Sequence, residues 1–395
     1  MLQDASPALR AAVIESLGRL RYAPAVPELL EHLERAEPTL QDKTAEAFLR
    51  MGADVAPALL AALPEAQPKV WSVAVRSLAK LLSEEDLRRS LVPDVARALT
   101  ELRGDRRLPD SLRGAGAGDG FVRLAELRLE ELRRTVLDAA WSVLERLMDE
   151  SVAQAIRLAT EDADEDVRDS GIEALAEGVG DTRLTAALLP CVVSWGEAPE
   201  PAEAEDAKAQ ARRMAAGGRD PWLRRLAAHA LQREEERPVG KEDRQLLGLL
   251  EKVVFLKQVP FFSRLSLDEL GRVAEIAEER FHPEGTRIFL QGTANKTMGV
   301  IISGRVSVTV RTPSGDELEV SELRENFVYG ENSSLYGMPT TASGTAVGGE
   351  LHLLAIDGDA LSRLIQLYPG IGLGVLRAAF DRVRKLEMSI AEKSK

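Results

Sequence analysis

Three segments of the first eighty or so residues repeat one another, and this internal repeat constrains the fold more than any other feature of the chain. They are SPALRAAVIESLGRL at 6–20, EPTLQDKTAEAFLRM at 37–51 and QPKVWSVAVRSLAKL at 67–81, with Pro7, Pro38 and Pro68 at the same position in each. Proline is favoured at the first position of a helix, where its missing N–H costs no hydrogen bond. A helical unit repeated about every 30 residues predicts a stack in which each repeat buries its apolar face against the next.

A second apolar segment with an early proline follows the first two repeats, as VPELLEHL at 26–33 and APALLAAL at 56–63. Weaker copies of the repeat occur at 164–178 and 220–232. Helix and turn alternating at this period predict an α-solenoid. The pattern P-x-[VL]-R-x-x-A-x-x-[AS]-L resembles short bacterial HEAT repeats over residues 4–235. The resemblance implies a surface for an unidentified protein partner.

Composition and charge exclude several classes of partner. Aromatic residues make up only 4% of the chain, which favours helix for most of its length. The net charge of −13 argues against nucleic acid and against anionic lipid, because both are bound mainly through Lys and Arg. The chain has no apolar run of membrane-spanning length and no signal-peptide pattern. We therefore expect a cytoplasmic protein without direct membrane insertion.

The sequence also lacks the residues that a metal site or a catalytic site would require. Cys191 is the only cysteine, and the four histidines are scattered without metal-ligand spacing. No nucleophile with an adjacent base, kinase signature or paired catalytic carboxylate is present. We predict no catalytic residues, no metal and no cofactor, and hence a protein that is not an enzyme.

Two irregular stretches interrupt the helical repeats. Residues 104–120 (GDRRLPDSLRGAGAGDG) are rich in glycine, but Asp119 stands where a dinucleotide-binding loop would need glycine. We expect an exposed flexible insertion there. Residues 197–218 are rich in Pro, Ala and Glu and are interpreted as a linker or insertion. Their acidic half could instead contact a basic partner.

After Gly240 the sequence pattern changes from helices to short strands. A helix is predicted at 244–257, and a second at 266–280, where Ser266 and Glu269 form a capping box. Strands are predicted at 286–290, 298–310, 317–323 and 351–356. The alternation RVSVTVR within the second strand predicts one buried and one exposed face. Helix returns from about Ala360.

The order of these elements resembles the cyclic-nucleotide-binding domain over residues 250–393, from VPFFSRLSLDELGRVA through FHPEGTRIFLQG and GVIISGRVSV to GENSSLYGMPTTA. The resemblance implies a multidomain chain, an α-solenoid followed by an α+β domain whose jelly-roll-like β-barrel is flanked by helices. We predict a HEAT-like α-solenoid at 1–196, a linker or insertion at 197–218, a final helical repeat element and connector at 219–243, and a cyclic-nucleotide-binding-like domain at 244–395.

The segment from Gly330 to Ala342 falls on the phosphate-binding cassette of that family, whose form is G-E-[hydrophobic]-A-L-L-x-x-x-P-R-[AST]-A. Gly330 allows close approach of the backbone, and the short run after it would offer N–H groups to an anion. The resemblance implies that Glu331 accepts a hydrogen bond from the ribose hydroxyl. The family arginine that pairs with the phosphate falls on Thr340, so the cassette lacks its cation.

The candidate ligand, cAMP or cGMP, would contact eight residues: Gly330, Glu331, Asn332, Ser333, Ser334, Thr340, Thr341 and Ala342. Hydroxyl groups of Ser333, Ser334, Thr340, Thr341 and Ser343 could donate in place of the missing cation. Thr341 is either a hint of guanine specificity or a solvated turn residue. Tyr329 and Tyr336 either line the site or pack in the barrel, and Arg305 and Arg311 belong to a neighbouring strand.

Three functions are compatible with these features. The first is a regulatory sensor, in which a bound cyclic nucleotide draws a C-terminal helix at 371–387 over the pocket and modulates what the solenoid binds. The second is an interaction scaffold with a vestigial pocket. The third is a soluble regulatory part of a membrane nucleotide-carrier system.

Overall fold

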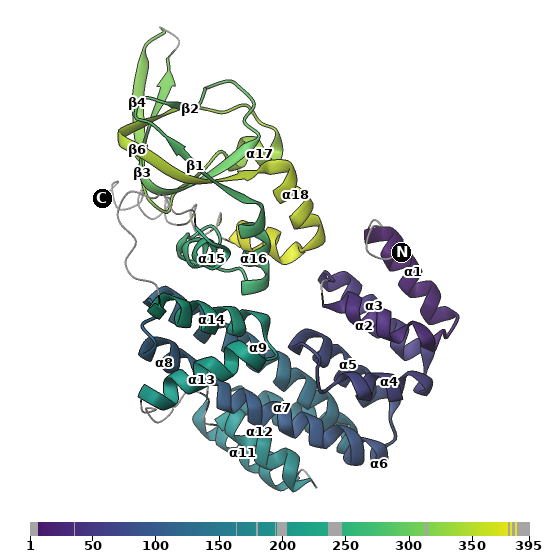
Figure 1. Cartoon of the computed structure of the whole chain (residues 1–395). Coiled ribbons are helices and arrows are strands. Elements are labelled where there is room, and N and C mark those ends of the chain that lie inside the picture. Colours follow the sequence, from purple (N-terminus) through teal and green to yellow (C-terminus); the bar gives the residue numbers. More distant parts are fainter. Residues whose placement is uncertain are drawn as a thin grey trace. The chain divides into compact units, whose positions relative to one another are not determined.

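A computed structural model describes residues 7–34, 36–162, 164–178, 181–193, 195, 204–235, 247–312, 315–377, 380 and 384. The chain divides into two compact units, Met1–Arg237 and Pro238–Lys395 (Figure 1). The first unit is helical, and the second contains an antiparallel β-sheet with helices. Among the described residues, no helix has both the length and the apolarity needed to cross a bilayer.

The helical unit begins with short helices that start at proline. Its α-helices are α1 (Pro7–Arg19), α2 (Val26–Leu33), α3 (Pro38–Met51), α4 (Ala56–Ala62), α5 (Pro68–Leu81), α6 (Glu84–Asp86), α7 (Val92–Asp105), α8 (Leu108–Gly114), α9 (Asp119–Leu147), α10 (Glu150–Thr160), α11 (Glu165–Gly178), α12 (Thr182–Val193), α13 (Ala204–Gly217) and α14 (Pro221–Glu235). The predicted helix starts at Pro7, Pro38 and Pro68 are confirmed. The segments at 26–33 and 56–63 form α2 and α4, as predicted.

The repeated helices pack in series, α1 against α3 and α3 against α5. Their apolar positions recur at helical spacing, so that Leu40, Phe48, Val70 and Leu78 are fully or almost fully buried. Gly18 lets α1 and α3 approach closely, because a Cβ there would lie 2.8 Å from the Cα of Ala47. The 29-residue α9 then departs from the regular helix pair and packs against α5, α7, α8 and α10.

The expectation of a flexible insertion at 104–120 is wrong for most of that stretch. Residues Leu108–Gly114 form α8, whose Leu108 and Leu112 are fully buried and which packs against α9 and α13. Two leucines four residues apart suffice for one apolar helix face. The positive φ of +79° at Gly116 marks the turn that separates α8 from α9.

Part of the stretch interpreted as a linker or insertion is also helical. Residues Ala204–Gly217 form α13, which packs against α8 and α14, and Ala211 and Met214 are buried in that contact. Residues 196–203, including most of the acidic half, lie outside the described residues. Residues 236–246 of the predicted connector lie outside them as well.

Cys191 lies on α12 in the interior of the helical unit. Its side chain has no exposed surface, and its Sγ lies 3.5 Å from the main-chain oxygen of Leu99 on α7. Burial raises the pKa of this thiol to about 11. The thiol is therefore protonated and shielded in the folded protein.

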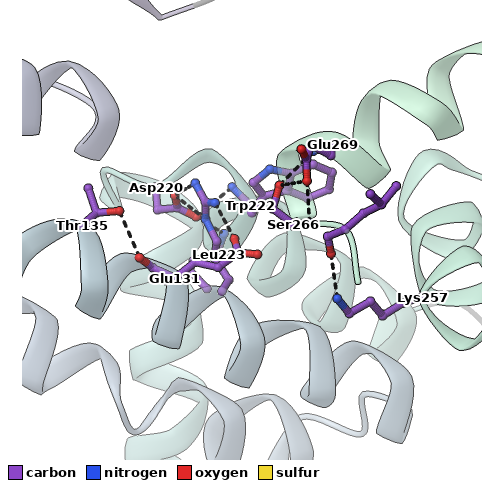
Figure 2. Close-up of polar contacts among 10 residues, drawn as sticks. Glu131, Thr135, Asp220, Trp222, Leu223, Lys257, Ser266 and Glu269 are labelled. Atoms are coloured by element: carbon purple, nitrogen blue, oxygen red, sulfur yellow. Dashed lines mark hydrogen bonds and ion pairs between the residues drawn. The ribbon is translucent and has the colours of Figure 1, made fainter. Parts of the chain in front are cut away.

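The second unit comprises α15 (Leu249–Gln258), α16 (Leu267–Ile276), β1 (Ala277–His282), β2 (Arg287–Phe289), β3 (Thr297–Arg311), β4 (Glu317–Leu323), β5 (Val328–Tyr329), α17 (Glu331–Tyr336), β6 (Ser343–Asp357) and α18 (Gly358–Leu367). The predicted capping box is present: Ser266 Oγ accepts from the Glu269 N–H at 3.3 Å, and Glu269 Oε2 accepts from the Ser266 N–H at 2.9 Å (Figure 2). The helix predicted at 266–280 ends earlier, at Ile276, because residues 277–282 pair with β6 as β1.

All strand pairs of the sheet are antiparallel, in the order β1-β6-β3-β4, with β2 paired to β6 and β5 to β3. The sheet surrounds an apolar core that includes Ile301, Val306, Leu351 and Leu353. The predicted alternation on β3 is confirmed, since Val306 and Val308 are buried while Arg305 is exposed. The long strands β3 and β6 fix the two ends of the connection from β5 to β6.

Candidate functional site

The connection between β5 and β6 carries all eight of the predicted ligand-binding residues. Tyr329 of β5 is opposite Gly299 in the sheet, and Ser343 of β6 is opposite Thr309. Both ends of the connection are thus held by strand β3. The connection consists of Gly330, α17 and residues 337–342, which form no regular element.

Gly330 stands at the N-cap of α17 in the left-handed region, with φ +78°. A Cβ at this position would lie 2.8 Å from Asn295 Nδ2 and 2.8 Å from the main-chain oxygen of Thr297. Both the backbone conformation and the close approach therefore require glycine. The close approach that the sequence predicts for Gly330 is made to the loop before β3.

That loop contains Asn295, which the sequence analysis did not identify. Its main-chain N–H donates to Ser333 Oγ at 2.7 Å, so the loop is tied to α17. Its side chain donates to the Thr297 main-chain oxygen at 2.8 Å and accepts from the Thr297 N–H at 3.1 Å. An Asn placed two residues before a strand is a known turn signal, and this signal could have indicated the residue.

The two serines of α17 serve the packing of the helix. Ser333 is only 6% exposed, and its hydroxyl accepts the bond from Asn295. Ser334 presents its main-chain oxygen to Gly358, where a Cβ would lie only 2.3 Å away. Gly358 is the first residue of α18, so α17 is clamped between the loop before β3 and the start of α18.

Thr340, on which the resemblance places the family arginine, forms its hydrogen bonds to the main chain of residues 290–293. Its N–H donates to the Thr293 main-chain oxygen at 3.0 Å, and its carbonyl accepts from the Gly292 N–H at 2.8 Å. Its Oγ1 lies within hydrogen-bond distance of the main-chain oxygens of Leu290 and Thr293. Both of these oxygens are acceptors, so the single hydroxyl proton of Thr340 is used there and not held free for a ligand.

The remaining predicted residues lie nearer the surface. Glu331 is the first residue of α17 and is half-buried, whereas Asn332 is exposed. Thr341 is exposed and Ala342 is half-buried. The structure thus gathers residues 330–334 on α17 and places 340–342 at the far end of the connection, against residues 290–293.

The two strand arginines have partners on β4. Arg305 Nη1 lies 3.5 Å from Glu322 Oε2, and Arg311 Nη2 lies 3.9 Å from Glu317 Oε1. Each guanidinium is therefore directed to a carboxylate of the neighbouring strand. Among the described residues, neither guanidinium forms a hydrogen bond or an ion pair with the cassette.

The two tyrosines differ in environment. Tyr329 is 7% exposed within the sheet core and stacks on Phe289, with 5.2 Å between ring centroids. Burial raises the pKa of its phenol. Tyr336, at the end of α17, is 72% exposed. Packing in the core, one of the two alternatives, thus describes Tyr329 but not Tyr336.

Comparison with known proteins identifies the second unit. Residues 279–368 match the family described as "Cyclic nucleotide-binding domain". The chain is 35% identical over 115 residues to cGMP-dependent protein kinase, isozyme 1, of Drosophila melanogaster, a match covering 29% of this chain and 15% of the kinase. It is 30% identical over 110 residues to the CRP-like cAMP-activated global transcriptional regulator of Mycobacterium tuberculosis, covering 28% of this chain and 49% of the regulator.

Among solved structures, the chain is similar to the N-terminal domain of a transcriptional regulator from Streptomyces coelicolor A3(2), at 26% identity. That match covers 33% of this chain and 94% of the other, with a TM-score of 0.30. The chain spans less than half of either curated relative. The matched family region runs from within β1 to the end of α18 and includes β2–β6 and the whole cassette. Residues 279–368 are therefore a domain of the cyclic nucleotide-binding family.

Proposed function

We propose that the protein is a non-enzymatic regulator, in which the C-terminal domain binds cAMP or cGMP at the cassette and modulates protein binding by a HEAT-like helical unit. The match of residues 279–368 to the cyclic nucleotide-binding family carries this proposal. The ligand is an anion with a ribose hydroxyl, and the cassette offers groups suited to each part.

In this proposal Gly330 and Glu331 recognise the sugar-phosphate. Gly330, held against the loop before β3, sets the position of the main chain that would face the phosphate, and Glu331 accepts a hydrogen bond from the ribose hydroxyl. Asn332 and Thr341, both exposed, complete the polar lining. With Thr340 in place of arginine, the phosphate has no charge-assisted partner from the cassette. We therefore expect affinity about one to three decades below that of a cassette with arginine.

The bonded state of Thr340 favours a second candidate function. Its hydroxyl closes the cassette onto residues 290–293, a structural use that needs no ligand. A nucleotide-independent scaffold would retain such a cassette for the fold alone. The two functions differ in one measurable property, the response to nucleotide.

The test is thermal unfolding of the full chain with millimolar cAMP or cGMP. A nucleotide that binds only the folded state raises the unfolding temperature. We expect one or both nucleotides to do so, and Glu331→Ala to abolish the shift. Glu319→Ala, which removes an exposed carboxylate on β4, is the matched control and should leave the shift unchanged.

A loss of the shift in both variants would indicate a general electrostatic effect and not a bond made by Glu331. The absence of any shift with either nucleotide in the unaltered protein would refute the sensor and favour the scaffold.

A further inference from the structure

A cavity of about 450 Å³ lies within the helical unit, between α5, α7, α9 and α13 and beside the turn before α14. Its volume lies in the range of small-molecule pockets. The larger apolar side chains of its wall are Trp71, Leu102, Leu132, Val136 and Met214. Gln210 fixes α13 beside the end of α7, since its Nε2 donates to the Gly104 oxygen at 3.0 Å and its Oε1 accepts from Ser111 at 3.0 Å.

Asp220 is a charged residue of this wall that is fully satisfied by its neighbours. One carboxylate oxygen accepts from the N–H groups of Trp222 and Leu223 at 3.1 and 2.9 Å, which caps α14 (Figure 2). The other lies 2.8 Å from Arg128 Nη2. Asp220 is 4% exposed and has no capacity left for a ligand cation of its own.

Glu101 and Arg219 also line the cavity and neutralise each other, with Arg219 Nη2 3.4 Å from Glu101 Oε2. Arg213 lines the cavity from the exposed side of α13. Glu101, Arg213 and Arg219 face the cavity together with Asp220. One further charged residue of the wall remains.

The remaining charged residue is Asp105, the last residue of α7. It is half-buried in the cavity wall, and among the described residues it has neither a hydrogen bond nor an ion pair from its side chain. Burial, first, and then the carboxylates of Glu101 and Asp220 raise the pKa of Asp105 to about 7. No described group of the protein forms an ion pair with the ionised carboxylate of Asp105.

We infer that this cavity binds a small organic amine, with its ammonium group at Asp105 and its apolar body against Trp71, Leu132 and Met214. The ammonium group would form an ion pair with the unpaired carboxylate of Asp105, and the apolar wall would contact an aromatic or aliphatic group of the ligand. A metal ion is a poorer match, because Asp105 is the only carboxylate of the wall without a partner and a metal needs several oxygen ligands.

The test is calorimetric titration of the full chain with phenethylamine, and with phenethyl alcohol as a neutral analogue of the same shape. The amine stays protonated at pH 6 and pH 8, whereas the ionised fraction of Asp105 rises from roughly one-tenth to roughly nine-tenths. We expect the affinity for the amine to be about tenfold higher at pH 8. The affinity for the alcohol should not change with pH.

Asp105→Asn should lower the affinity for the amine at pH 8 by about tenfold and remove its pH dependence, leaving the alcohol unaffected. Asp42→Asn, an exposed carboxyl on α3, is the matched control and should bind as the unaltered protein does. Ala98→Leu fills the cavity from α7 and should abolish binding of both compounds. This variant tests the cavity independently of whether Asp105→Asn folds. No amine binding at pH 8, or equal binding by Asp105→Asn, would overturn the inference.

Discussion

At the scale of single residues, Thr340 stabilises the fold at the position where the resemblance predicts a ligand-binding arginine. A family arginine would place a guanidinium at this position, but here a hydroxyl bonds to the main-chain oxygens of Leu290 and Thr293. These bonds join segments 47 and 50 residues apart in the chain. The residue that would decide phosphate affinity therefore also closes the cassette.

Thr340→Arg should raise the affinity for cAMP or cGMP by roughly ten- to a hundredfold, because it supplies a charge-assisted bond of about 1.5–3 kcal/mol. The same change removes the Thr340 hydroxyl bonds and should lower the free energy of unfolding by about 1 kcal/mol. Titration with nucleotide and chemical denaturation measure the two effects.

Thr340→Val is the control for this substitution, since it removes the hydroxyl without adding charge. It should show the loss in stability but no gain in affinity. A folded Thr340→Arg protein that binds no better than Thr340→Val would show that the missing cation is not what limits binding.

Sequence reasoning at this scale could predict residues with a local signal. Gly330 was identified by its place in a motif, and the structure places it at the N-cap of α17 with a φ of +78°. The role of Ser333 could not be predicted, because its partner Asn295 is 38 residues away. Hydrogen bonds between residues so far apart in the chain depend on the tertiary fold, and a single sequence does not indicate them.

At the scale of elements, the proline and capping-box signals at helix starts were reliable. The helix predicted from residue 244, however, begins at Leu249, and the helix predicted to residue 280 ends at Ile276. Ser266 and Glu269 cap α16, as their spacing predicts. Residues 277–280 (AEER) are good helix formers, yet they are part of β1 because β6 offers them a pairing edge. Tertiary pairing there outweighs a propensity of a few tenths of a kcal/mol per residue.

Ser266→Ala should lower the stability of the C-terminal unit by about 1 kcal/mol, since it leaves the Glu269 N–H at the start of α16 without its partner. Denaturant unfolding of the full chain measures the change. Ser263→Ala is the control, because Ser263 Oγ donates only to the Pro260 carbonyl at an exposed position. Equal losses in the two variants would contradict the role of the cap.

At the scale of the whole molecule, the change of pattern after Gly240 predicted two kinds of structure, and the chain does divide into a helical and a sheet-containing unit. Their effect on each other could not be predicted, because residue patterns report burial within a unit and not the free energy that couples two units. The proposed regulation depends on that coupling.

The buried thiol of Cys191 makes the coupling measurable as a reaction rate. A thiol reagent can modify this residue only when the helical unit opens, so its rate of labelling reports the population of open molecules. If nucleotide at the cassette acts on the helical unit, saturating cAMP or cGMP should change that rate, and Glu331→Ala should remove the change. An unchanged rate alongside a nucleotide-dependent unfolding temperature would mean that the domain binds its ligand without transmitting the event. The labelling rate of Cys191, the only cysteine of the chain, thus reports how nucleotide binding at the C-terminal domain changes the opening of the helical unit.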